Sequence, residues 1–251
     1  MNARPSSAPN SPETGERFEG LIPPVAPAPC FSIRKPAQRI HRLIDYVEAG
    51  MMLGSAAALL KELVRDRRNV IVAGGTSSGK TTLVNALLAE TADLEERIVI
   101  LEDTRELNCA AEDCVTLRTK PGVASLSDLV RSTLRLRPDR IIVGEVRGVE
   151  ALDMLKAWNT GHPGGMSTVH ANSARGALYR LEQLVQEAVV TVPRRLIAEA
   201  VNTIVFIDGR GSARRIIAID RVDGLTSDGD YALTSLLNRP HPQPSHSGET
   251  P

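Results

Sequence analysis

Aromatic residues are scarce in this sequence, with three phenylalanines, three tyrosines and one tryptophan among 251 residues. A core built on stacked aromatic rings is therefore excluded. The hydrophobic share is nevertheless 42%, which is ordinary for a globular protein. The core must consist of leucine, isoleucine, valine and alanine, as in a sheet that helices cover on both faces.

An excess of charge of either sign is also lacking, since 30 lysines and arginines balance 30 aspartates and glutamates. This balance argues against a protein that binds nucleic acid over its whole surface, and we expect no direct sequence-specific contact with nucleic acid. Several arginines do gather between 131 and 147. A local group of arginines fits a phosphate site better than a nucleic-acid surface.

Cysteine and long apolar runs are sparse as well. Three cysteines give no disulfide framework and suit a reducing compartment. No run approaches the roughly 18 apolar residues of a membrane span, and the first residues contain no apolar signal core. We therefore expect a cytoplasmic protein.

Short apolar segments alternate with amphipathic ones through most of the chain. Residues 1–30 are rich in proline, serine and alanine and are predicted to be disordered, as is the tail from about 223. Helices are predicted over 39–48, 55–66 (with Ser55 as N-cap), 79–89, 126–136, 149–158, 174–188 and 193–200, and strands over 31–34, 69–73, 97–101, 114–117, 140–143, 166–170, 204–208 and 214–221. This alternation predicts an α/β fold with a mostly parallel sheet.

One segment matches the phosphate-binding pattern G-x-x-x-x-G-K-[ST] in full. It follows the apolar strand NVIVA and precedes an apolar helix, and its residues are Gly74, Gly75, Thr76, Ser77, Ser78, Gly79, Lys80, Thr81 and Thr82. Glycines let backbone N–H groups surround a phosphate, and the helix N-terminus adds partial positive charge. Lys80 is a point charge for the β- and γ-phosphates, and the Thr81 hydroxyl is a ligand for Mg²⁺. A flexible glycine-serine linker would not explain Lys80 or the flanking strand.

Carboxylates follow two of the predicted strands. Glu102 and Asp103 end the strand RIVIL, and Glu145 follows RIIV. Ligands of α/β sheets bind at the carboxyl ends of the strands, so these acids are candidates to hold Mg²⁺ and to orient water. His170 ends a further strand, and arginines such as Arg105, Arg118, Arg131, Arg140 and Arg147 are candidates to stabilise charge on a transferring phosphoryl group. Two or three of the arginines are expected to reach the nucleotide.

The segments GGTSSGKTT, ILEDTREL, LRLRPDRIIVGEVRG and TGHPGGMSTVHANS resemble the four motif boxes of the type II/type IV secretion ATPase superfamily. The sequences of these segments are most similar to the conjugative-transfer branch of the superfamily. The resemblance extends from about residue 31 to 225. The resemblance implies a RecA-like P-loop motor over 67–222, a remnant of an N-terminal domain with linker helices over 31–66, and a flexible tail over 223–251. It also implies an Mg²⁺-dependent ATPase that forms a hexamer at the cytoplasmic face of the inner membrane, together with the secretion or conjugation machinery.

The same resemblance implies roles for single residues. Glu102 would activate water, Glu145 would hold the Mg²⁺-bound water, and His170 would sense nucleotide, with Arg105 and Arg147 assisting. The residues themselves leave open which glutamate is the base. Family members carry an N-terminal domain of roughly one hundred residues, of which only residues 31–36 look like the final strand here, so we expect a weakened ring. A type II secretion or pilus motor, and an ATP-binding scaffold that hydrolyses little, are the alternative functions.

Overall fold

The structure, a computed structural model, describes residues 17–35 and 40–237. Its strands are β1 Arg17–Leu21, β2 Cys30–Arg34, β3 Val70–Gly74, β4 Ile98–Glu102, β5 Cys114–Arg118, β6 Arg140–Val143, β7 Met166–His170, β8 Thr203–Asp208, β9 Arg215–Leu225 and β10 Tyr231–Ser235. Its helices are α1 Leu43–Glu48, α2 Gly54–Arg65, α3 Lys80–Ala89, α4 Leu126–Thr133, α5 Glu150–Asn159, α6 Ala174–Gln186 and α7 Arg194–Ala200, with a short 3₁₀ turn at Gly211–Ala213. In the described ranges no helix is both long and apolar enough to cross a bilayer.

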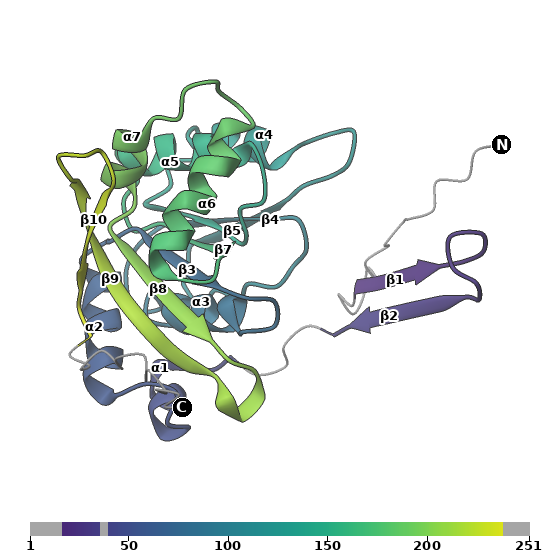
Figure 1. Ribbon diagram of the computed structural model, residues 1–251, viewed down its shortest axis with the longest axis horizontal. Helices are drawn as coiled ribbons and strands as arrows, with labels where there is room; N and C mark the ends of the chain where they lie inside the picture. The colour runs from purple at the N-terminus through teal and green to yellow at the C-terminus, as the bar shows by residue number, and fades with distance from the viewer. Residues whose placement is uncertain (1–16, 36–39, 238–251) are drawn as a thin grey trace, which may run out of the picture.

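Eight strands form one sheet in the order β10-β9-β8-β3-β7-β6-β4-β5 (Figure 1). The strands from β8 to β5 pair in parallel, whereas β9 and β10 are antiparallel. The predicted α/β sandwich with a mostly parallel sheet is therefore confirmed. The order also places β7 between β3 and β6, with β4 next to β6.

Helices cover both faces of this sheet, and β3 shows how the sequence achieves it. Val70 and Val72 pack with α1, α2 and α3, whereas Ile71 and Ala73 pack with α5, α6 and α7. Because side chains alternate along a strand, every residue of β3 must be apolar to serve both cores. All its residues are buried.

The ends of the chain differ from the prediction. β1 and β2 form an antiparallel hairpin in which Phe18 pairs with Ile33, so the disorder predicted for residues 1–30 is wrong for β1. The flexible tail predicted from 223 is also wrong as far as β10, because Tyr231 is fully buried and Arg175 donates to the carbonyl of Tyr231. Such tertiary contacts leave no periodic signal. The rest of both tails, 1–16 and 238–251, lies outside the described residues.

Helix boundaries differ by a few residues. α1 begins at Leu43 rather than 39, and α4 ends at Thr133 rather than 136. Ser55 is not the N-cap of α2: the helix begins at Gly54 behind Leu53, whose side chain makes no capping hydrogen bond. Local propensity rarely fixes helix ends more closely.

Candidate active site

The parallel strands bring the predicted site residues to one edge of the sheet. The P-loop follows β3, His170 ends β7, Glu145 follows β6, and Glu102 ends β4. These strands are neighbours in the order β3-β7-β6-β4. Residues almost one hundred positions apart therefore meet where α/β folds bind ligands.

The P-loop wraps around its own lysine. Lys80 Nζ donates to the carbonyls of Gly74 at 3.0 Å and Gly75 at 2.8 Å, and only 7% of Lys80 is exposed. The loop is held further by Ser78, whose hydroxyl donates to Gly75 O at 2.9 Å, and by left-handed backbone at Ser77 and Gly79. Thr76 and Ser77 lie exposed at the tip of the loop.

His170 joins the lysine to the glutamate of the next strand. Its Nδ1 lies 3.3 Å from Lys80 Nζ, and its Nε2 lies 2.8 Å from Glu145 Oε1. A lysine ammonium only donates, so Nδ1 must be the acceptor and Nε2 carries the proton. Burial, and then the charge of Lys80, lower the pKa of His170. The imidazole is therefore neutral at pH 7 and links the two charged groups.

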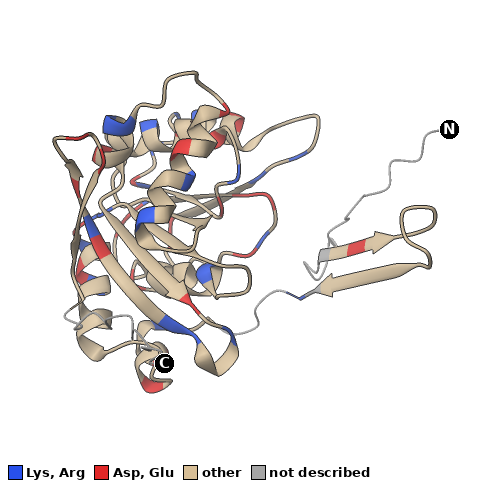
Figure 2. Cartoon of the chain, in the orientation of Figure 1, with Lys and Arg blue, Asp and Glu red and all other residues tan. Residues whose placement is uncertain are grey.

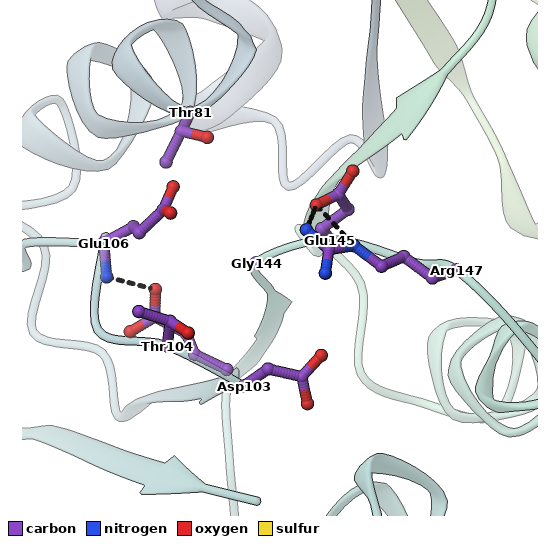
Figure 3. A pocket seen from close by; sticks show the side chains of 8 residues that line it. Thr81, Asp103, Thr104, Glu106, Gly144, Glu145 and Arg147 are labelled. Atoms are coloured by element: carbon purple, nitrogen blue, oxygen red, sulfur yellow. Dashed lines mark hydrogen bonds and ion pairs between the residues drawn. The ribbon is translucent and has the colours of Figure 1, made fainter. Parts of the chain in front are cut away.

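The second oxygen of Glu145 accepts hydrogen bonds from an arginine. Arg147 donates to Glu145 Oε2 through Nε at 2.7 Å and through Nη2, and Figure 3 shows the pair beside Gly144. The Arg147 backbone N–H is in turn held by the Glu150 carboxylate at 2.6 Å. Arg147 and Glu145 thus enter one cavity from the same turn after β6.

That cavity is lined by Thr81, Glu102, Asp103, Thr104, Glu106, Gly144, Glu145 and Arg147. Figure 3 shows Thr81 on the P-loop helix facing Glu106 across it. One wall thus carries the predicted Mg²⁺ ligand of the P-loop, and the others carry the predicted acids.

Glu102 differs from the other acids because it is only 3% exposed. Its Oε1 accepts from the backbone N–H groups of Glu106 at 2.9 Å and Leu107 at 2.8 Å. Its Oε2 is buried and has no hydrogen-bond partner within the described chain. Burial raises the pKa of Glu102 to about 7, outweighing the two N–H groups, which lower it.

The predicted arginines divide into two groups. Arg147 lines the cavity, whereas Arg105 is exposed on the loop after β4 and lies outside the cavity lining. Arg140 is fully buried and ion-paired with Glu96 at the opposite, amino-terminal end of β6, and Arg131 pairs with Asp153 on α5. These two ion pairs lie away from the cavity. That two or three arginines reach the nucleotide stays a prediction, for which Arg147 is the best placed of these four residues.

The comparisons with known proteins agree with this geometry. Residues 17–208 match the family described as type II/IV secretion system protein. The chain belongs to this family. The resemblance inferred from the motif boxes is thereby confirmed, and the sequence match spans the hairpin, the P-loop and every strand of the site.

The chain is also similar to individual proteins of known name or structure. Conjugal transfer protein TrbB of Rhizobium radiobacter is 49% identical over 223 residues, which are 88% of this chain and 69% of that protein. Among solved structures, the VirB11 ATPase from the Brucella suis type IV secretion system is 29% identical with a TM-score of 0.62, covering 86% of this chain and 73% of that one. The pilus retraction motor PilT, at 20% identity and a TM-score of 0.63 over 89% of this chain and 64% of that one, shares the fold.

Two features of the site were missed by sequence reasoning. Glu106 and Thr104 line the cavity because the loop after β4 turns back over its strand to hold Glu102. Arg214 lies in the turn that joins β8 to β9, and its side chain reaches the P-loop, where Nη2 lies 3.4 Å from Ser77 O. No motif marks Arg214, since its position depends on β8 pairing with β3 and on the turn that leads from β8 to β9.

Proposed function

We propose that this chain hydrolyses ATP with Mg²⁺ and that the energy drives conjugative DNA transfer or type IV secretion. The observation that carries the chemistry is the buried, unpartnered Oε2 of Glu102 beside Thr81 and Glu145. The proposed role in transfer is supported by the 49% identity to a conjugal transfer protein.

Glu102 is the proposed general base. Its Oε2 accepts a proton from a water whose oxygen attacks the γ-phosphorus, and the bond to the leaving ADP oxygen breaks. A base is most effective when its pKa lies near the working pH, and the pKa of about 7 meets that condition. Glu145, bound to Arg147 and close to His170, is less free to take a proton.

The residues of the cavity fit Mg²⁺. Thr81 and Glu145 supply hydroxyl and carboxylate oxygens, the ligands that Mg²⁺ prefers. Over the described ranges no group of three or more histidines, cysteines, aspartates or glutamates is placed to hold a metal ion. Held by Thr81 and Glu145, Mg²⁺ would offset the negative charge of the nucleotide phosphates.

Lys80 is proposed to change hydrogen-bond partners when nucleotide binds. Lys80 Nζ donates hydrogen bonds to the loop carbonyls and lies within hydrogen-bond distance of His170 Nδ1. Phosphate oxygens are stronger acceptors for a cation than these neutral groups. When Lys80 turns to the phosphate, His170 Nδ1 loses its donor while Nε2 stays beside Glu145. His170 thereby reports nucleotide occupancy to Glu145.

We further propose that the chain works as a homo-hexameric ring at the cytoplasmic face of the inner membrane, attached to the secretion machinery. Basic and acidic residues are interspersed over the described chain (Figure 2), which fits a protein partner rather than bulk nucleic acid.

Two assays test the function. Purified protein should release phosphate from ATP only with Mg²⁺, and Lys80→Ala should not. In a mating assay, a donor lacking this gene should regain DNA transfer with the wild-type gene and not with Lys80→Ala. Full transfer by the variant would overturn the motor role, and absence of hydrolysis by the wild-type protein would favour the scaffold alternative.

A further inference from the structure

The end of β8 and the turn that follows it lie against the P-loop. A Cβ on Gly74 would lie 2.4 Å from the carbonyl oxygen of Ile207, and a Cβ on Gly79 would lie 2.7 Å from Nε of Arg214. Both distances are shorter than real Cβ contacts, and Gly79 also has a positive φ, so β8 and the Arg214 side chain lie close against the P-loop. The turn is tight as well, because a Cβ on Gly209 would lie 2.4 Å from Ala213 O and Gly209 has a positive φ.

Arg214 is fixed in this turn with an unused donor. Its Nη2 makes a long contact of 3.4 Å with Ser77 O. Its Nε is buried and has no acceptor among the described residues. A buried guanidinium N–H without a partner is costly, and here it lies beside a loop that binds phosphate. An anionic oxygen of a ligand would satisfy it.

Arg214 also lines a second cavity of about 370 Å³, large enough for a nucleoside. Its other walls include Thr82, Tyr46, Met51, Asp45 and Glu48. Tyr46 is 3% exposed, and its hydroxyl is a further buried group with no hydrogen-bond partner in the described part of the chain. The cavity is therefore a built site with two unsatisfied donors.

The two cavities lie at consecutive residues of the P-loop helix. Thr81 lines the cavity of Glu102 and Glu145, and Thr82 lines the cavity of Arg214. A triphosphate with its γ-phosphate beside Thr81 directs its α-phosphate and ribose towards Thr82. The linear shape of the nucleotide thus connects the two cavities.

We propose that Arg214 binds the α-phosphate of the nucleotide and that the second cavity, with Tyr46, holds the nucleoside. This inference rests on the proposed function, since it takes the triphosphate at the P-loop as given. The guanidinium offers paired donors to phosphate oxygens, and the carboxylates of Asp45 and Glu48 suit ribose hydroxyls. Arg214 contributes to affinity for ADP and ATP alike, because both carry an α-phosphate, and leaves the chemical step to Glu102.

The experiment measures nucleotide affinity and turnover of Arg214→Gln and Arg214→Lys by calorimetry and phosphate release. Arg215→Gln is the matched control, because the neighbouring Arg215 donates through Nη1 to the turn carbonyls of Ser212 and Arg214 and does not line the second cavity. Arg214→Gln should raise the Kd of ADP and ATP, and the KM, by about 10- to 100-fold, the range for a lost charge-assisted hydrogen bond. The kcat at saturating ATP should stay within about twofold. Arg214→Lys should fall between wild type and Arg214→Gln.

Wild-type affinity in Arg214→Gln would overturn the inference. So would a loss of kcat at unchanged KM, which would make Arg214 a support of the reacting end of the site. If the wild-type protein itself binds neither ADP nor ATP, the proposed function and this inference fail together, whereas normal binding by both wild type and Arg214→Gln overturns only the inference.

Discussion

A Cβ on Gly144 would lie 3.2 Å from Cγ of Glu102. Gly144 follows β6 and Glu102 ends the neighbouring β4, and the Gly144 N–H donates to Leu101 O at 2.9 Å. A side chain at the residue before Glu145 would therefore press on the side chain of the proposed base.

Gly144→Ala should lower turnover without unfolding the protein. The added methyl group displaces Glu102 by a few tenths of an ångström, and an error of about 1 Å in placement costs about 100-fold in rate, so we expect a loss of about tenfold. Steady-state phosphate release measures it. Gly54→Ala is the control, since that position has open space. Full activity in Gly144→Ala would show that the contact does not position Glu102.

Lys80→Ala should remove hydrolysis while the fold survives. Lys80 bonds mainly to loop carbonyls and His170 rather than to the apolar cores, so we expect the melting temperature to change by a few degrees at most. Calorimetry and phosphate release on the same sample check both parts. Turnover near the wild-type rate would contradict the assignment of the phosphate site.

The pH dependence of kcat should report Glu102. A general base must be ionised, and burial raises the pKa of Glu102 to about 7, so turnover should fall below about pH 7. His170 has a lowered pKa, and its titration lies further to the acid side. In His170→Asn the remaining activity should still fall below about pH 7. If this fall disappears in the variant, it reports the titration of His170 and not of Glu102.

Stability should respond to the same carboxyl group. A pKa raised in the folded state means that the folded protein holds this proton more tightly than the unfolded chain. The contribution to stability is therefore fully present below about pH 4 and is lost as pH rises towards 7. Glu102→Gln removes this loss, and at pH 8 it should be more stable than wild type by up to about 3 kcal/mol. Urea unfolding at pH 5 and pH 8 tests it, and equal pH dependence in both proteins would contradict the buried, titrating carboxyl.

The sequence predicts the site better than it predicts the ends of the fold. Strong local signals mark the P-loop, the apolar strands and the acids that follow them, and parallel pairing brings those ends together. β10 and the position of Arg214 depend on contacts with α6 and the P-loop, which no short-range period encodes. The choice of Glu102 over Glu145 as the base likewise depends on the burial and the hydrogen-bond partners of each carboxylate. The sequence shows neither.

The most direct test compares single-turnover hydrolysis by Glu102→Gln with that by Asp103→Asn. Asp103 is the neighbouring acid of the same cavity, but it is exposed and its Oδ1 accepts from the Thr119 hydroxyl. Glu102→Gln should bind ATP normally and lose about 10²- to 10⁴-fold in the rate of phosphate release, whereas Asp103→Asn should lose less than about tenfold. Hydrolysis by Glu102→Gln within a few fold of wild type would contradict the assignment of Glu102 as the base.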